Sequence, residues 1–385
     1  IAISAIAISP LHVLYAQEAR QYSLWTVTIL LSSWAMLRAM RVNTKKSWGV
    51  YAVTLALGLY THLISVMVAI AHGIYVISKE SFRFTKTVIA YIFASLTGFL
   101  LFLPWMIIYL AHSKDRIDKS PGWSKTATPL TSLVQTWILN LSRVFFDFND
   151  SFSYRNSLGY ILIIIIVVYS VYFICRHTPK RVWLFIGILI GVPALLLAMP
   201  DLILGGRRST PIRYFIPSYL SIQIAIAYLI YVKISPSMSL KIWEQKLWQF
   251  TTIALISSVI ISCVFIFHAD TWWNKYREYY HSEVAKIINQ ANNPLVIAPW
   301  FDMRSLSHSL ASHVELQDIR LRKEINSVGK GFSDVFFYKN KGPLKYFLDT
   351  HPNYRIENTY NWKRQTTPVT TTKTTLWQIV KDESI

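Results

Sequence analysis

Long apolar runs alternate with short polar connections along the first 268 residues and predict membrane-spanning helices. Residues 158–175 and 182–199 carry no charged side chain, and runs of about 18 apolar residues are long enough to cross a hydrocarbon core. The pattern predicts spans near residues 22–39, 48–60, 63–78, 87–110, 158–175, 182–199, 214–232 and 248–267.

Lysine and arginine are concentrated in every second connection between these predicted spans. The positive-inside rule places such connections in the cytoplasm. The opposite connections, and everything after residue 267, are then extracytoplasmic. The basic residues that set this orientation are Arg38, Arg41, Lys45, Lys46, Lys79, Arg83, Lys86, Arg176, Lys180, Arg181, Lys233, Lys241 and Lys246.

The run 48–78 is short for two spans, and only Thr61 and His62 interrupt it. A single helix would move the basic connection 79–86 to the other face of the membrane. Two short helices keep all four basic connections on one side, so the sequence predicts a break at Thr61 and His62.

Composition supports an integral membrane protein and changes how the charge is interpreted. The 385 residues are 53% hydrophobic and 15% charged, whereas soluble domains hold about 25% charged residues. The net charge of +19 is explained largely by the basic connections, and no nucleic-acid-binding motif accompanies it. Because Ile1 lies inside an apolar run, we interpret the chain as following earlier membrane segments.

The pattern changes after residue 268 and predicts a second domain. Apolar content falls over residues 269–385, and short strand-like runs flank a helix-like stretch at 280–291. We expect a small C-terminal α/β extramembrane domain here, after a membrane domain at 1–268. His308 and His313 are five residues apart, which does not align two ligands on one helix face, so surface histidines and no metal are expected. The predicted strands are 294–299, 335–338 and 375–380.

Glu18 and Arg20 lie between two apolar runs, just before the span that begins near Tyr22. An ionisable group at membrane depth costs at least ~2.5 kcal/mol, so it persists when it pairs, lines a cavity or has a function. Two interpretations stay open: an interfacial cap for the helix that follows, favoured by the helix dipole, or part of a polar pocket.

A second polar cluster, within "PDLILGGRRSTPIRYFIPSYL", is predicted on the same outer side. Arg207, Arg208 and Arg213 precede Tyr214 and an apolar span. Arginine supplies forked donors that suit phosphate oxygens. Lipid headgroups or a specific phospholipid-linked substrate would both satisfy these arginines.

Three short segments give the chain a resemblance to a known family. "SP-x-x-x-x-YAQEAR-x-YSL", "LGLYTHL" and "TPIRYFIP" resemble motifs of the GT-C membrane glycosyltransferases, in the branch of dolichyl-phosphate-mannose protein mannosyltransferase-like and aminoarabinose transferase-like proteins. The resemblance extends from Pro10 to about Phe267. It implies a GT-C-like polytopic α-helical fold and transfer of a sugar from a polyprenyl-phosphate donor to a protein, lipid or glycan acceptor outside the cytoplasm, at the plasma membrane.

The resemblance also implies roles for residues of this chain. The main acidic base would lie in a loop upstream of Ile1, and Glu18 would be a supporting acidic group. Arg213 is the first candidate for the donor phosphate, with His62 as a possible site residue at the outer turn. No cofactor is expected, and a divalent metal lacks sequence support. The further phosphate candidates are Tyr214, Arg20, Arg207 and Arg208.

Two other functions remain compatible with the sequence. A transporter or flippase for a lipid-linked glycan would bind phosphate without catalysis, but transporters commonly place polar groups near the bilayer midplane. An outer-face glycan polymerase or ligase would also use outer arginines.

Further polar residues carry expectations of their own. The segment 128–148 predicts an interfacial amphipathic helix, and Asp147 and Asp150 after it are expected to be solvated loop carboxylates. His72, inside an apolar run, is expected to hydrogen-bond to a neighbouring helix. His12 stays ambiguous between a structural and a site role.

Overall fold

The computed structural model describes residues 2–112, 122–235, 241–276, 278–318 and 331–381. The chain divides into two compact units. The helical unit comprises Ile1–Phe148 and Phe152–Phe267, and the sheet unit comprises Asn149–Ser151 and His268–Ile385.

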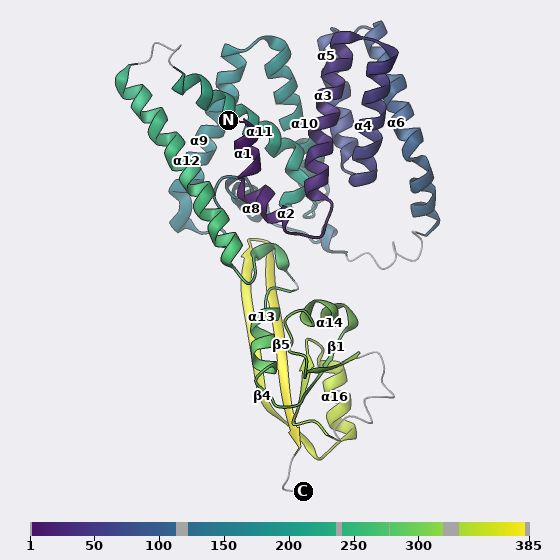
Figure 1. Ribbon diagram of the computed structural model, residues 1–385, viewed down its shortest axis with the longest axis vertical. Helices are drawn as coiled ribbons and strands as arrows, with labels where there is room; N and C mark the ends of the chain where they lie inside the picture. The colour runs from purple at the N-terminus through teal and green to yellow at the C-terminus, as the bar shows by residue number, and fades with distance from the viewer. Residues whose placement is uncertain (1, 113–121, 236–240, 277, 319–330, 382–385) are drawn as a thin grey trace. The chain divides into compact units, whose positions relative to one another are not determined.

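The helical unit consists of long helices joined by short connections (Figure 1). All eight runs that were predicted as membrane spans are helical, so the helical part of that prediction is confirmed. The helices and 3-10 turns are α1 (Ala2–Ala7), α2 (Pro10–Ala16), α3 (Tyr22–Val42), α4 (Lys45–Thr61), α5 (Ser65–Lys79), α6 (Lys86–Ala111), η1 (Gly122–Lys125), α8 (Leu130–Ser142), η2 (Tyr154–Asn156), α9 (Ser157–His177), α10 (Lys180–Leu204), η3 (Ile212–Phe215), α11 (Ile216–Ile234) and α12 (Ile242–His268).

Local sequence sets where these helices begin and end. Asn43 closes α3 in the left-handed conformation at φ 49°, and Thr44 then caps α4 by a reciprocal pair of hydrogen bonds with Ser47, which satisfies amide groups that a helix start leaves open. The predicted break inside the run 48–78 is confirmed, because α4 ends at Thr61 and His62 is extended.

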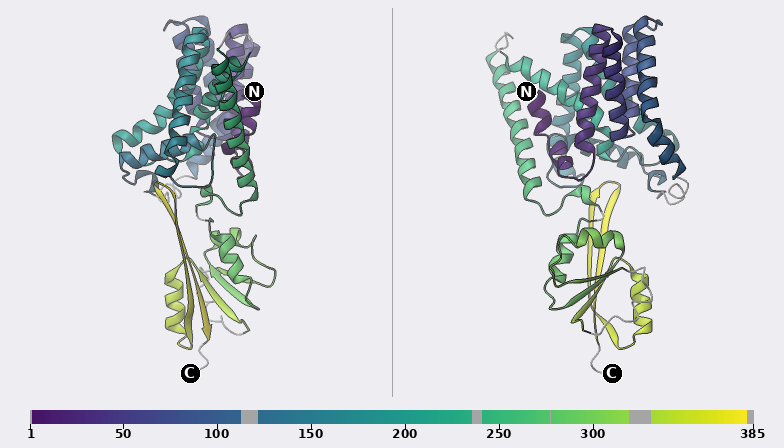
Figure 2. Two further views of the ribbon diagram at one scale, coloured as in Figure 1. Left: turned by 90° about the vertical axis from the view of Figure 1, so that its left-hand side faces the viewer. Right: turned by 45° about the vertical axis from the view of Figure 1, so that its right-hand side comes forward.

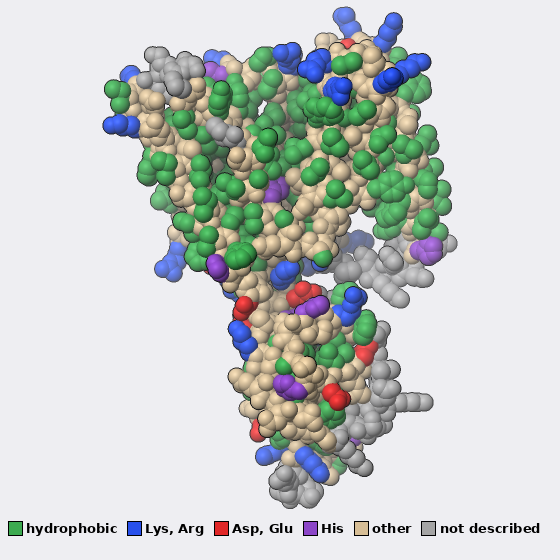
Figure 3. Space-filling view, in the orientation of Figure 1, with side chains coloured by type: hydrophobic (Ala, Val, Ile, Leu, Met, Phe, Trp, Pro, Cys, Tyr) green, Lys and Arg blue, Asp and Glu red, His purple; other side chains and the backbone are tan. Residues whose placement is uncertain are grey.

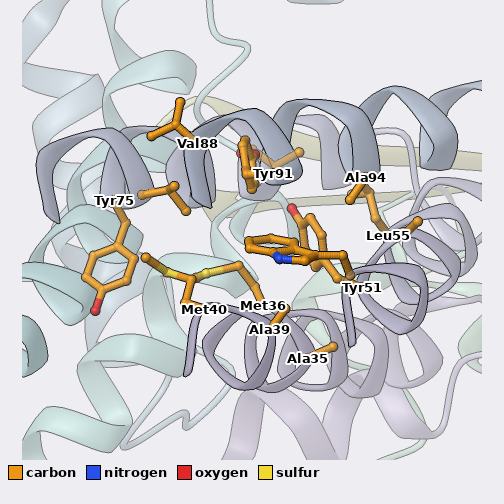
Figure 4. Packing of buried hydrophobic residues seen from close by; sticks show 14 of the residues in the cluster. Ala35, Met36, Ala39, Met40, Tyr51, Leu55, Tyr75, Val88, Tyr91 and Ala94 are labelled. Atoms are coloured by element: carbon orange, nitrogen blue, oxygen red, sulfur yellow. The ribbon is translucent and has the colours of Figure 1, made fainter. Parts of the chain in front are cut away.

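Helices α3 to α6 pack side by side around a buried cluster that includes Met36, Tyr51 and Tyr91 (Figure 4). The close approach of α4 and α6 depends on Gly98. A Cβ atom at this position would lie 2.9 Å from the carbonyl oxygen of Ala52, so α6 lies against the backbone of α4 where no side chain intervenes.

The outer surface of the helical unit is apolar. Large hydrophobic side chains such as Phe93, Leu100, Ile253 and Phe267 are more than half exposed, and Figure 3 shows green side chains over this unit. Among the described residues, five helices are long and apolar enough to cross a membrane: α6, α9, α10, α11 and α12. Exposed apolar surface on this scale indicates a membrane protein.

The connections α3–α4 and α5–α6 lie at the same end of the helical unit, where Figure 3 shows lysine and arginine side chains gathered. Tyr22, the first residue of α3, lies at the opposite end of that helix. The break between α4 and α5 therefore returns the chain to the basic end. The exposed basic residues of these two connections are Arg41, Lys45, Lys46, Lys79, Arg83 and Lys86.

The structure confirms the expected hydrogen bonding of His72 and overturns the expected solvent exposure of Asp147. His72 accepts or donates hydrogen bonds at both ring nitrogens, 3.0 Å from Ser33 Oγ and 3.3 Å from the Tyr51 hydroxyl, which confirms bonding to neighbouring helices. The prediction that Asp147 is solvated is wrong: it is 3% exposed, and its Oδ1 lies 3.8 Å from Nε of the equally buried Arg143. The buried guanidinium compensates the charge of the carboxylate.

The segment 128–148 contains the predicted helix, α8. Its buried residues include Leu133, Thr136 and Leu139, which recur at helical spacing and form one face. Asn140 donates a hydrogen bond to the carbonyl oxygen of Thr210, and Trp137 donates one to Ser209 Oγ. Helix α8 therefore supports the loop before α11.

The sheet unit holds five strands in the order β2-β1-β3-β5-β4. Strands β1, β2 and β3 are parallel, and β5 runs antiparallel to β3 and β4. The three predicted strands and the predicted helix are present; β2 and β4 were not predicted. The elements are η4 (Trp273–Lys275), α13 (His281–Ile288), β1 (Pro294–Ala298), α14 (Trp300–Leu306), β2 (Glu315–Asp318), β3 (Asp334–Tyr338), α16 (Lys341–Thr350), β4 (Tyr354–Thr367) and β5 (Thr370–Lys381).

Helices cover both faces of this sheet (Figure 2, left). On one face α13 and α14 bury a cluster with Phe336 and Tyr338, and on the other α16 buries Leu344 and Phe347 against Phe337. Alternate residues of β3 supply the two cores, as a strand covered on both faces requires. His308 and His313 are exposed, which confirms that they are surface residues.

Candidate functional site

The candidate site lies where α3 begins, beside the turn between α4 and α5 and the 3-10 turn η3. Residues 17–21 connect α2 to α3, so Glu18 and Arg20 lie next to Tyr22, the first residue of α3. Three sequence segments that are far apart in the chain therefore meet at one end of the helical unit.

Arg213 lies at the centre of this arrangement. Its guanidinium carbon is 5.9 Å from the ring centroid of Tyr22 and 5.3 Å from that of Tyr214. Cations within about 6 Å of an aromatic ring centroid are attracted by the ring. The two rings orient the guanidinium, which keeps a planar fork of donors suited to a phosphate or a carboxylate.

His62 joins the same group from the turn after α4. Its ring stacks on Trp25 with centroids 4.3 Å apart, and its centroid is 5.9 Å from Tyr22 and 6.2 Å from Tyr214. The amide of Ile64 donates to Nδ1 of His62 at 3.2 Å, so the proton of the neutral ring lies on Nε2. Burial, with help from the charge of Arg213, lowers the pKa of His62 to about 4. His62 is therefore a neutral donor at physiological pH.

Glu18 and Arg20 form an ion pair at the edge of this site. Nε of Arg20 lies 3.8 Å from Oε2 of Glu18, whose side chain is 8% exposed, while that of Arg20 is 58% exposed. The side chain of Arg20 also lies beside the hydroxyl of Tyr22. A buried carboxylate next to an exposed guanidinium matches the polar-pocket interpretation, and the pair also holds the turn before α3.

The loop before η3 separates the remaining arginines from Arg213. Arg208 donates to Asp201 Oδ1 at 3.2 Å and to the carbonyl oxygen of Gly205 at 2.9 Å. Asp201, fully buried in α10, also accepts from the amide and hydroxyl of Ser209. These bonds hold Arg208 within the loop. The backbone of Arg207 bonds to Ser124 and Thr210.

Replacing Gly206 by alanine is expected to disrupt this loop. Gly206 has φ +124°, and a Cβ atom there would lie 2.5 Å from the carbonyl oxygen of Ser124 and 2.7 Å from a guanidinium nitrogen of Arg208. Backbone strain of this kind costs about 1–3 kcal/mol, so the melting temperature in detergent should fall by several degrees. Gly187→Ala is the matched control, because nothing lies within 4 Å of its Cβ position. Equal melting temperatures for the two variants would contradict the expectation.

A cavity of about 400 Å³ opens beside the site. It is bounded by α1, α2, the start of α3 and the start of α11. Tyr22 lines it and also contacts Arg213, so Tyr22 connects the cavity to the guanidinium. Its lining residues include His12, Tyr15, Gln17, Ser23, Thr26 and Ile216.

A second cavity of about 310 Å³ lies on the other side of α1 and is almost wholly apolar. Residues of α1, α11 and α12 line it, among them Ile226, Leu255 and Val259. Nε2 of His12, which lines the first cavity, lies 3.1 Å from Oε1 of Gln223, which lines the second. This hydrogen bond marks the boundary between the two cavities and gives the ambiguous His12 a place in the wall.

Sequence reasoning named most of this site but missed three of its residues. Tyr22 and Trp25 resemble ordinary aromatic residues at the start of a predicted membrane span, and no spacing distinguishes them. Gln223 carried a usable signal, because an amide inside a long apolar run needs a partner. The structure brings Glu18, Arg20, His62, Arg213 and Tyr214 into one neighbourhood.

Because His62 is neutral in the folded protein, lowering the pH is expected to reduce the stability of the protein. Because the folded pKa of His62, about 4, lies below the ordinary 6.5, protons bind the unfolded state first, and stability present above pH 6.5 is lost as the pH falls towards 4. Between pH 7 and pH 5 the melting temperature of the wild type should fall by about 2–4 °C more than that of His62→Gln. Parallel pH profiles for the two proteins would contradict this expectation.

Among the described residues, no group of three or more His, Cys, Asp or Glu side chains is arranged to hold a metal ion. Comparisons with protein-family models, with curated proteins and with solved structures found no match to this chain.

Proposed function

We propose that this chain is a membrane glycosyltransferase that moves a sugar from a polyprenyl-phosphate donor to an acceptor on the extracytoplasmic face. The observation that supports this most is the position of Arg213 between Tyr22 and Tyr214, next to a cavity of about 400 Å³. A guanidinium held by aromatic rings beside a cavity is suited to bind a phosphate group of a ligand that occupies the cavity.

In the proposed reaction the bond between the anomeric carbon and the phosphate oxygen breaks, and a bond from the acceptor oxygen to that carbon forms. Polyprenyl phosphate leaves with the electron pair, and the acceptor proton passes to a carboxylate. Arg213 would stabilise the charge that grows on the phosphate, where such groups contribute most. Glu18 would orient the acceptor.

The remaining residues fit supporting roles. Tyr214 and the neutral His62, which donates from Nε2, would hydrogen-bond the phosphate or the sugar. Arg20, more than half exposed, would meet the donor as it arrives. The apolar second cavity would accept part of the polyprenyl chain, with the His12–Gln223 contact between the lipid chain and the headgroup.

The location of the polar groups favours an enzyme over a transporter. Glu18, Arg20, His62 and Arg213 lie at the ends of α3, α4 and α11, whereas transporters commonly bind their substrates near the bilayer midplane. A polymerase or ligase for lipid-linked glycans would use the same end of the molecule and differs in its acceptor.

A transfer assay tests the proposal. The protein, placed in nanodiscs, is incubated with radiolabelled polyprenyl-phosphate sugars and a membrane extract. Label that moves to an acceptor supports the proposal, and the chemical class of the labelled product separates monosaccharide transfer from polymerisation. Label that stays on the lipid but crosses the bilayer of proteoliposomes would overturn it in favour of a transporter.

A further inference from the structure

The sheet unit contains a topological switch point at the carboxyl ends of its central strands. Strand β1 leads through α14 to β2 on one side, and its neighbour β3 leads through α16 to the opposite half of the sheet. The two helices cover opposite faces (Figure 2, left). In sheets of this kind, ligands bind outside the carboxyl ends of the parallel strands where the connections diverge.

A cluster of polar side chains occupies this edge. Asp302 follows β1 in the first turn of α14, Tyr338 ends β3, and Lys339 comes directly after it. Nζ of Lys339 lies 2.6 Å from Oδ1 of Asp302 and 4.8 Å from the ring centroid of Tyr338. Lys339 adopts φ 65°, a conformation that is uncommon for a residue with a side chain and is found more often at functional sites.

His281 supplies the observation that points to a ligand. It begins α13, its ring centroid lies 5.6 Å from that of Tyr338, and it is 5% exposed. Among the described residues, neither of its ring nitrogens has a hydrogen-bond partner. Leaving a buried polar group unsatisfied costs about 1–3 kcal/mol, so a buried imidazole with two open nitrogens is suited to contacts that a bound molecule provides.

The charge of the cluster favours a neutral ligand. Burial and the neighbouring Lys339, partly opposed by Asp302, lower the pKa of His281 to about 4, so the ring is uncharged and offers one donor and one acceptor. The opposite charges of Lys339 and Asp302 cancel within their ion pair. The hydroxyl of Thr374 on β5 lies beside that of Tyr338 and adds a further group that both donates and accepts.

Two exposed aromatic side chains flank the same edge. Trp300 is 49% exposed and Phe301 is 77% exposed, and they immediately precede Asp302 at the start of α14. Exposed aromatic rings next to hydrogen-bonding groups are typical of recognition sites. A pyranose ring matches this combination, because its C–H face packs on aromatic rings while its hydroxyls both donate and accept.

We propose that this edge of the sheet unit binds a neutral saccharide. Trp300 and Phe301 pack against the sugar ring, and its hydroxyls reach His281, Tyr338 and the pair formed by Asp302 and Lys339. Lys339, the most exposed polar group of the cluster at 17%, has a long flexible side chain that moves aside to admit a hydroxyl. This site is formed by residues of the sheet unit alone and does not depend on the transfer reaction.

Saturation-transfer difference NMR on the whole protein in nanodiscs tests the proposal without any lipid donor. The probes are neutral oligosaccharides of glucose, mannose and N-acetylglucosamine. At least one is expected to receive saturation at its ring protons, with an affinity that falls about tenfold in Trp300→Ala and in His281→Phe. His281→Phe should leave the melting temperature unchanged or raise it, because the substitution removes unsatisfied buried atoms.

His308→Phe is the matched control, since His308 is exposed after the end of α14 and should not alter binding. Trp300→Ala keeps the test valid if His281→Phe fails to fold, because Trp300 is a surface residue. The proposal is overturned if none of the three oligosaccharides binds, or if binding persists equally in both variants. Either failure leaves the transfer reaction at Arg213 untouched, because the two assays share no ligand.

Discussion

Arg213→Ala is expected to lower the rate of sugar transfer about 100- to 1000-fold, the loss found when one charge-stabilising donor is removed from an active site. The phosphate gains negative charge as its bond to the sugar breaks, and Arg213 is the guanidinium that both Tyr22 and Tyr214 orient. Single-turnover assays with a radiolabelled polyprenyl-phosphate sugar in nanodiscs measure this rate.

Arg213→Lys distinguishes charge from geometry. Lysine keeps the positive charge but loses the planar fork and its stacking on aromatic rings. We expect this variant to recover part of the rate, at a value between those of the wild type and Arg213→Ala. Recovery to the wild-type rate would show that a point charge suffices.

The matched control is Arg41→Ala. Arg41 is an exposed arginine in the last turn of α3, at the opposite end of the helix from Tyr22, so its removal should leave the rate unchanged. Size-exclusion profiles and melting temperatures establish that each variant is folded. Transfer at the wild-type rate by folded Arg213→Ala would remove this residue from the mechanism.

Asp147→Ala is expected to destabilise the protein by about 3–5 kcal/mol, because removing one partner of a buried ion pair leaves the other charge uncompensated. Arg143 and Asp147 are 2% and 3% exposed. The amide of Asp147 also bonds to Ser262 Oγ on α12, so the segment after α8 is tied to that helix. Thermal unfolding in detergent, followed by the loss of the monodisperse peak, measures the effect.

Two further variants test whether the loss of charge compensation destabilises the protein. Asp270 forms an exposed pair with Lys286, with side chains 65% and 70% exposed, and Asp270→Ala should cost no more than about 1 kcal/mol. The double variant Arg143→Met with Asp147→Leu should regain much of the lost stability, since apolar pairs often replace buried ion pairs at no cost. A double variant as unstable as Asp147→Ala would show that packing, not charge, determines the effect.

The helices were largely predictable because apolar runs of this length have few alternatives. The break at Thr61 and His62 followed from the charges of the flanking connections, and the hydrogen bonds of His72 followed from the cost of burying a polar ring. The prediction that Asp147 is solvated was wrong because its partner, Arg143, lies one helical turn earlier within an amphipathic segment. Sequence alone does not show that both side chains point inward.

In the sheet unit, the sequence did not predict β4 because its residues are mostly polar and exposed. Of its 14 residues, only Thr366 and Thr367 are buried, so alternation of apolar residues gave no signal. For the candidate site, the arginine and acidic segments were identified separately. Their meeting depends on the packing of α3, η3 and the α4–α5 turn, and local patterns do not determine such tertiary contacts.

Helices α4 and α5, with 17 and 15 residues, rise only about 26 Å and 22 Å, whereas a hydrocarbon core measures about 30 Å. If both helices cross the membrane, as the charges of the flanking connections predict, the bilayer around them would thin locally or their flanking side chains would extend to the interface. Local thinning would draw the lipid headgroups next to the turn at His62 inward by several ångströms. A phosphate on a long-chain lipid would meet Arg213 with less of its chain pulled out of the hydrocarbon, and thicker membranes would oppose that approach.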